Sequence, residues 1–520
     1  MDLRLLLAAC VFSLVPATAS ATEETPELAK ASEATGKAFE AGDYDKAYAL
    51  ASAELRACEA TKRGGYYCIM LYFTATNTAL KAGQSAAALA HARQAMAVGE
   101  KFLPPESGTF AMAISHLASV MDGQGQQREA EPLHRRALDI YLKALPKGHW
   151  AILTAADNLA LNLMDQGKLP QARSLFREVL QQRMDAPDPD LLAIGKSARK
   201  LATVTQLQGN FAEVEPLLRT VVQIYETKLP AGHPDIAGAY DALGQCLDLL
   251  GRSTESEPLF RKALALREAS LPAGHNDIGT SYSGLATSLE NQGKLAESEP
   301  LYRRALAIYE KALPPGHQRI AIALGNLGNN LSVQGRVDEA IGYYRRALEI
   351  NEKAFPGGSP AVATSLNNLA TAYMRKGLFV SAEPLLRRSL ALALASLRPE
   401  HPEVGMTYGN LATTLVRQER YAEAEKLMRQ SLAIVEKLPN PDHPDLIQRE
   451  WDLAVVLEQN PGRRAEIRSL YRRAEARAMR RVAGFAGFDG GAQGELRKYK
   501  PLFLGEVRAA WALAAQSPKP

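Results

Sequence analysis

Apolar residues recur along most of the chain at steps of three and four residues, the spacing of one face of a helix. Within residues 276–314, a first apolar stripe over Ile278–Leu289 ends at Gly293, and a second over Leu295–Tyr309 ends at Pro314. A left-handed glycine commonly ends a helix, and proline cannot continue one. The pattern predicts two antiparallel helices joined by a short turn.

The same two-helix pattern repeats every 42 residues. Seven glycines keep this step: Gly125, Gly167, Gly209, Gly251, Gly293, Gly335 and Gly377. Glu-Pro and Gly-His pairs hold the same register, for example at Glu257, Glu299, His233 and His275, and Glu419 stands where the next glycine is due. One pair is too small to bury its own apolar face, so neighbouring pairs supply the core. We predict an all-α solenoid of about eleven helix-turn-helix units.

Small and large residues in each unit resemble the tetratricopeptide repeat, or TPR. In one unit these residues are Leu285, Ala286, Leu289, Ser298, Tyr302 and Ala305. The 42-residue period and strings such as Leu366–Ala370 resemble kinesin-light-chain-type repeats. The resemblance implies a right-handed superhelix whose first helices line a concave groove. We expect irregular repeats over 22–104, regular repeats over 105–460 and a basic cap over 461–520.

The resemblance also implies a peptide-binding site. In the family, an asparagine before the Leu-Ala or Leu-Gly step bonds the backbone of a bound extended peptide. The matching residues are Asn158, Asn326, Asn368 and Asn410, with Asn330 one turn further on and Arg375 and Arg417 beyond that. Arginines there would bind an acidic residue or a terminal carboxylate. Lys200, Ala242 and Gly284 interrupt the asparagine series, so bridging between repeats is an alternative role for these amides.

The first 21 residues have the pattern of a signal peptide. An apolar run over Leu5–Val15 precedes small-x-small cleavage sites that end at Ala19 and Ala21. Lipidation at Cys10 is the minor alternative. We expect a periplasmic or secreted protein. In an oxidising compartment, Cys58 and Cys68 are placed to form a disulfide across a turn, with two separate buried thiols as the alternative.

Net charge, motifs and residue spacing argue against nucleic-acid binding, catalysis and metal binding. The formal charge of +4 over 520 residues argues against a dedicated nucleic-acid binder. Gly195-Lys196-Ser197 lacks the preceding glycine and strand of a phosphate loop, and the histidines recur one per repeat, too far apart to share a metal. We predict no enzyme, no cofactor and no metal site.

Residues 463–520 carry 13 Lys and Arg against 5 Asp and Glu, a net charge of +8. We expect their arginines to lie mostly on a solvated helix face. The more specific alternative is a patch that contacts an acidic partner or anionic lipid headgroups. Tyr499–Ala514 is predicted to form a capping helix. It weakly resembles the segment that joins such repeats to a CHAT-type protease domain, and we expect neither that domain nor its protease activity here.

Three hypotheses follow for function. The first is an exported scaffold that binds an extended segment of a protein partner through Asn326, Asn368 and Asn410. The second is a regulatory partner of a separately encoded enzyme of the CHAT-protease type, with contacts through Phe503 and Trp511. The third is an envelope-assembly protein held at a membrane by the basic tail. The sequence names no partner for any of them.

Overall fold

The computed structural model describes residues 26–60, 66–437, 442–459 and 461–483, together with Tyr499, Leu502, Leu504 and Gly505. Over these residues the regular secondary structure is entirely helical. The chain divides into two compact units between Ala231 and Gly232. The 42-residue period runs through this boundary unbroken, so the sequence did not predict it. The expected signal peptide over 1–21 lies outside the described residues.

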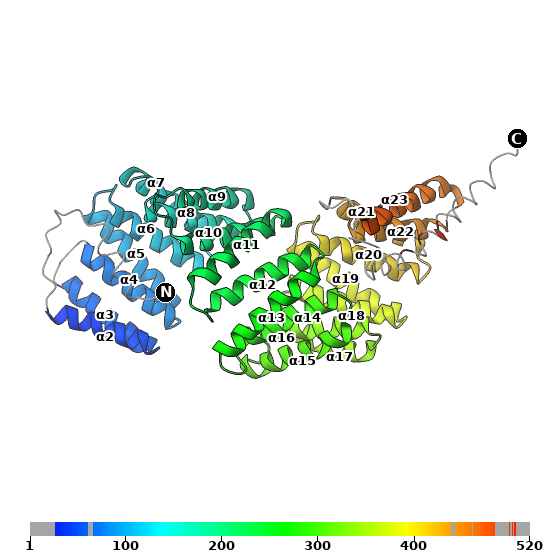
Figure 1. The fold of residues 1–520 in the computed structure, drawn as a ribbon, viewed down its shortest axis with the longest axis horizontal. Coiled ribbons are helices and arrows are strands. Elements are labelled where there is room, and N and C mark those ends of the chain that lie inside the picture. Colours follow the sequence, from blue (N-terminus) through cyan, green and yellow to red (C-terminus); the bar gives the residue numbers. More distant parts are fainter. Residues whose placement is uncertain are drawn as a thin grey trace. The chain divides into compact units, whose positions relative to one another are not determined.

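Unit 1 contains five helix pairs within its described residues (Figure 1). They are α2 (Pro26–Glu40) with α3 (Tyr44–Ala60), α4 (Tyr66–Lys81) with α5 (Ser85–Phe102), α6 (Gly108–Gly123) with α7 (Gln127–Ala144), α8 (Trp150–Asp165) with α9 (Leu169–Met184), and α10 (Leu191–Leu207) with α11 (Phe211–Lys228). Each pair is one repeat of the period read from the sequence.

Unit 2 contains six pairs in the part of the chain that is described. They are α12 (Pro234–Leu249) with α13 (Ser253–Ser270), α14 (Asn276–Asn291) with α15 (Leu295–Ala312), α16 (Gln318–Val333) with α17 (Val337–Ala354), α18 (Pro360–Arg375) with α19 (Phe379–Ser396), α20 (Pro402–Val416) with α21 (Tyr421–Val435), and α22 (Pro444–Leu457) with α23 (Arg464–Ala483), the last preceded by the short 3₁₀ helix η1 (Pro461–Arg463). The eleven pairs confirm the predicted all-α solenoid of TPR-like units.

Within each unit the first helices of the pairs form one face. Each second helix packs against its own first helix and against the first helix of the next pair. First helices also contact each other directly, as α16 contacts α18 and α18 contacts α20, whereas the second helices lie further apart. We call the surface lined by the first helices the first-helix face. It is where the resemblance places the groove.

From α2 to α20, each first helix is followed by a residue in the left-handed conformation. The seven glycines of the period have φ between 75° and 85°, which glycine adopts without strain. Glu419 holds the same turn with φ of 61°, and it is the sole non-glycine residue with a positive φ among those described. The interruption that the sequence showed at Glu419 is therefore a strained copy of the same turn.

The repeated histidines cap the first helices. In six pairs the Nδ1 atom accepts a hydrogen bond from the backbone N–H two residues later, over 3.1–3.3 Å. These residues are His149, His233, His275, His317, His401 and His443. Ser107, Asp190 and Ser359 perform the same task in other pairs. The motif thus satisfies backbone donors at helix starts.

The glutamate of the Glu-Pro motif clamps neighbouring repeats together. Glu299 in α15 accepts hydrogen bonds from Arg303 one turn later at 2.8 Å, and from Gln334 and Arg336 of the next repeat at 3.1 and 2.8 Å. Partial burial alone would raise the pKa of Glu299, but these three donors outweigh it and lower the pKa to about 2. The carboxylate is therefore charged throughout the neutral range, and it stabilises the repeat junction.

The same clamp recurs in other repeats, and at one junction the charges of the two partners are exchanged. Glu131, Glu257 and Glu383 each bind an arginine of their own helix together with a glutamine and a cation of the next repeat. One junction exchanges the charges: Arg173 stands in the glutamate position and donates to Gln208 and Glu213 of the next repeat. At these five junctions, a charged side chain of one repeat therefore binds polar side chains of the next.

Cys58, at the end of α3, and Cys68, in α4, are joined in a disulfide within the first two helix pairs. Both belong to an apolar cluster that includes Ile69 and Phe73. Cys246 is buried in α12 and takes no part in a disulfide. The cross-link ties the first two described helix pairs together.

The arginines of η1 and α23 are exposed or partly exposed, as expected, and several of them form ion pairs with acidic residues. Arg473 and Arg477 each form an ion pair, at 3.0 and 3.1 Å, with Glu450 of α22, whose side chain is completely buried. Arg480 pairs with Asp442, and Arg463 pairs with Glu425 and Glu466. The basic helix is therefore held by acidic residues of the last repeats. No described helix is long and apolar enough to cross a bilayer.

Candidate functional site

The first-helix face of α16, α18 and α20 aligns Asn326, Asn368 and Asn410 at one position of three successive repeats. All three side chains are partly exposed. Packed helices lie about 8–10 Å apart. An extended chain advances about 3.3 Å per residue. Amides with this spacing would meet roughly every third residue of an extended segment that lies across the three helices.

Two of these amides have unused hydrogen-bonding capacity. Among the described residues, neither Asn326 nor Asn368 has a side-chain hydrogen bond, and the same holds for Asn158 in α8. Asn410 differs, because its Nδ2 donates to Oδ1 of Asn367 in the preceding repeat at 3.0 Å. A primary amide has two donor hydrogens and two acceptor lone pairs, so Asn410 retains part of its capacity.

Asn410 shows that this position also bridges repeats, the alternative that the sequence left open. Lys200 occupies the same position in α10 and donates to Asp157 of the preceding repeat at 2.8 Å. Neither Asp157 nor Asn367 was singled out in the sequence. Each stands one residue before the asparagine position and is buried. A polar residue at this position of the repeat was the sequence signal that could have indicated a bridge between repeats.

Asn330 does not lie on the first-helix face, which corrects its assignment as a binding residue. Its side chain is completely buried. It donates to Ser298 at 2.6 Å and accepts from Gln334 at 2.7 Å. Asn162 is placed similarly, 1% exposed and bonded to Asp122 of the preceding repeat. One helical turn beyond the asparagine position, the side chain faces the interior of the array. The amides at this second position therefore hold adjacent repeats together.

Arg375 and Arg417 both lie exposed at the end of the first helices. Arg375 donates to the carbonyl of Ser332 in the preceding repeat at 3.0 Å. Arg417 lies over the ring of Phe379, 6.0 Å from its centre. Neither forms an ion pair among the described residues, so both retain donors for an anionic group.

Apolar side chains complete this face. Ile322 and Met406, each one turn before an asparagine, are 54% and 40% exposed.

His116 occupies the asparagine position of α6, in unit 1, and sequence reasoning missed it. Burial lowers the pKa of His116 to about 4, so its ring is neutral at pH 7.

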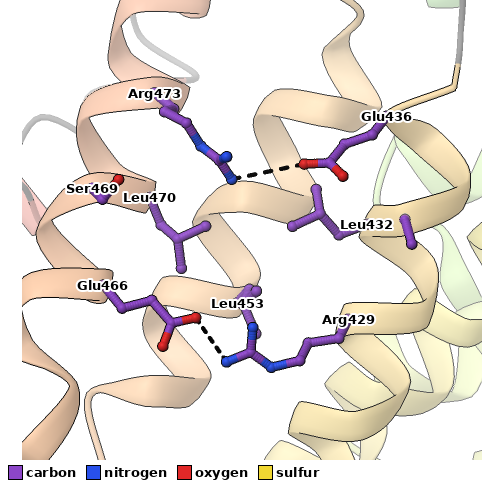
Figure 2. Close-up of a pocket in the computed structure, with 9 residues that line it drawn as sticks. Arg429, Leu432, Glu436, Leu453, Glu466, Ser469, Leu470 and Arg473 are labelled. Atoms are coloured by element: carbon purple, nitrogen blue, oxygen red, sulfur yellow. Dashed lines mark hydrogen bonds and ion pairs between the residues drawn. The ribbon is translucent and has the colours of Figure 1, made fainter.

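A cavity of about 350 Å³ lies between α21, α22 and α23. Its charged side chains face each other across the opening (Figure 2). Arg429 pairs with Glu466 at 2.8 Å, and Arg473 approaches Glu436 to 3.8 Å. Leu432, Leu453 and Leu470 also line it. Because these charges satisfy each other, the cavity belongs to the packing of the last repeat.

Within the described residues, no group of three His, Cys, Asp or Glu side chains is arranged to hold a metal ion. Tyr499 and Leu502 are buried in the same apolar cluster as Tyr471 of α23. Leu504 and Gly505 are the other described residues of the predicted capping helix, and its remaining residues, including Phe503 and Trp511, lie outside the described part.

The tetratricopeptide-repeat family models match the chain over residues 110–151, 151–227, 194–269, 277–353, 361–437 and 406–480. Among curated proteins, none matches. The solved structures similar to this chain include kinesin-light-chain TPR-like repeats from Podosopora anserina, at 25% identity over 39% of this chain and 97% of that one, with a TM-score of 0.35.

Two further structures are similar. BtubC (BKLC) from P. vanneervenii matches at 23% identity over 47% of this chain and 91% of that one, with a TM-score of 0.36. The apo form of RapI matches at 14% identity over 55% of this chain and 98% of that one, with a TM-score of 0.44.

Proposed function

This chain belongs to the tetratricopeptide-repeat proteins, with repeats of the kinesin-light-chain type, and we propose that it binds an extended segment of a partner protein on the first-helix face of α16, α18 and α20. Repeats of this family serve as protein-interaction scaffolds. The proposal adds where the partner lies and which side chains hold it. Asn326, Asn368 and Asn410 would bond the main chain of the bound segment.

One observation carries the proposal: the side chains of Asn326 and Asn368 form no hydrogen bond with the described residues, although they stand at the same position of neighbouring first helices. The equivalent Lys200 and Asn410 are bonded to the preceding repeat. An amide without a structural task, repeated at the same position of neighbouring helices, suits the donors and acceptors of an extended backbone. Ile322 and Met406 would contact apolar side chains, and Arg375 and Arg417 would select an acidic side chain or a terminal carboxylate.

The test compares capture of partners by the wild-type protein and by Asn326→Ala/Asn368→Ala. Neither asparagine side chain has a hydrogen bond to another described residue, so the variant should keep the stability of the wild type. Gln430→Ala is the matched control, because it removes an exposed amide from the second helix α21. We expect the double variant to lose a partner that wild type and control both retain. Equal capture by all three would refute the proposal.

We also propose that the mature protein is exported and acts in the periplasm or outside the cell. The apolar run over Leu5–Val15 and the cleavage sites at Ala19 and Ala21 support this location. The N-terminus of the mature protein, read by mass spectrometry after expression in a bacterium, tests it. Expected is a chain that begins near residue 20 or 22; an uncleaved chain retained in the cytoplasm would contradict it.

A further inference from the structure

The first helices α12 and α14 carry acidic residues and no basic ones. These acids are Asp235, Asp241 and Asp248 in α12, and Asp277 and Glu290 in α14. The next first helices differ, because α16 and α18 each contain one arginine and no acidic residue. Residues 232–294 as a whole hold eight acidic and five basic residues, so the second helix α13 and the joining turns do not cancel the excess.

Helix stability does not explain Asp248 and Glu290. Both stand in the last turn of their helices, where the helix dipole disfavours negative charge. Asp248 accepts a hydrogen bond from Ser256 at 2.5 Å, and Glu290 accepts one from Asn330 at 3.4 Å. Neither forms an ion pair among the described residues, and both are partly exposed. Burial raises the pKa of Asp248, so a nearby cation would stabilise its charged form.

Asp241 lacks a cation that its counterpart in unit 1 possesses. Asp157 of α8 and Asp241 of α12 occupy the same position of the repeat, and each pairs with an arginine of its own repeat. Asp157 also pairs with Lys200 of the next repeat at 2.8 Å, whereas Gly284 stands in place of that lysine beside Asp241. Asp241 is 7% exposed, and its Oδ1 atom has no hydrogen-bond partner among the described residues. Burial raises the pKa of Asp241 in spite of its arginine.

We infer that the first-helix face of α12 and α14 binds a basic stretch of the partner segment, an inference that rests on the proposed function. A lysine or arginine of the partner supplies the cation that Lys200 supplies in unit 1, and the acidic helices complement its charge. Ala242 and Gly284 stand at the asparagine position here and are partly exposed, so no long side chain obstructs the approach. Packed helices lie about 8–10 Å apart and an extended chain advances about 3.3 Å per residue. The basic residues should therefore lie about three to six residues to one side of the residue that meets Asn326.

Selection of random peptides displayed on phage, with the immobilised mature full-length protein as bait, tests this inference. Selected peptides should carry lysines or arginines clustered at one end of an uncharged stretch. Fluorescence anisotropy then measures the affinity of one labelled selected peptide. Ala242→Lys places the protein's own cation on this face and should weaken binding about tenfold. It should fold as the wild type does, because α10 carries Lys200 at the same position. Ala242→Gln adds a long side chain without charge and should bind as the wild type does.

Removal of the acidic charges gives a second arm. Asp248→Asn/Glu290→Gln keeps the hydrogen-bond acceptors and should also weaken binding of the labelled peptide. Selected peptides without a basic cluster, equal affinity of Ala242→Lys and Ala242→Gln, or full affinity of Asp248→Asn/Glu290→Gln would overturn the inference. The proposed function would survive these results if binding still required Asn326 and Asn368. Peptides that bind Asn326→Ala/Asn368→Ala as well as the wild type would refute the proposed function instead, and a selection that yields no peptide would contradict both.

Discussion

Replacing Glu299 with glutamine tests the clamp between repeats. Glutamine keeps the size of the side chain and removes the charge that Arg303 and Arg336 bind. A drop in pKa from 4.5 to about 2 corresponds to roughly 3 kcal/mol of preference for the charged form in the folded state. The side chain of Glu299 is 16% exposed and its partners lie near the surface, so solvent screening reduces the effect. We expect Glu299→Gln to lose about 1–2 kcal/mol of unfolding free energy at pH 7.

The sign of the pH dependence follows from the lowered pKa. A carboxyl group whose pKa is lower in the folded state stabilises the fold at pH values above its unfolded pKa of about 4.5. That contribution disappears as the pH falls toward 2. The stability difference between wild type and Glu299→Gln should therefore be complete at pH 7 and shrink steadily below pH 4.5. Glu257, with the same low pKa of about 2, should behave alike.

Urea unfolding followed by circular dichroism, at pH 7 and at several values between pH 5 and pH 2, measures this difference. Hydrogen exchange of α15, α16 and α17 would locate the loss at the junction. Glu297→Gln is the matched control, since Glu297 is exposed in the first turn of the same helix and forms no ion pair among the described residues. A difference that stays constant between pH 7 and pH 2, or one equal to that of the control, would refute the charged clamp.

Three further predictions concern single residues. His275→Ala should cost about 1 kcal/mol in thermal or urea unfolding, while His275→Asn, which supplies another acceptor for the helix start, should cost clearly less; equal losses would mean that the cap is not the reason. Glu419→Gly should raise unfolding free energy by about 0.5–1 kcal/mol, because glycine relieves the left-handed strain, and a loss of stability would contradict the strain argument. Glu450→Ala should cost about 3–5 kcal/mol and release α23 in hydrogen exchange, because it leaves Arg473 and Arg477 without their buried partner; unchanged protection of α23 would show that the pair does not anchor it.

The repeat architecture was predictable because its determinants are local. The 42-residue step fixed each turn, since Gly293 and its counterparts must adopt positive φ and few residue types do so without strain. Even the irregular turn at Glu419 was visible as a missing glycine. The division at Gly232 was not, because it depends on how helices pack across repeats, and the period is uninterrupted there.

The roles of polar residues were less predictable, because they depend on partners about 32 to 43 residues away. Asn330 and Asn326 look alike in the sequence, yet a single helical turn separates a buried bridge from a partly exposed amide. The histidines repeated with the period, but only the structure identifies Nδ1 as a helix cap. The ion pairs of the α23 arginines were not predictable, because their acidic partners, such as Glu450, lie in another helix.

Photo-crosslinking from the first-helix face tests the central claim most directly. A photoreactive residue at Thr364, exposed on α18 one turn before Asn368, would be compared with one at Glu349, exposed on the second helix α17. In envelope extract, we expect Thr364 to capture one partner reproducibly, mass spectrometry to map the link to a short extended segment, and Glu349 to capture none of it. Capture of the same partner from Glu349 but not from Thr364 would contradict peptide binding on the first-helix face.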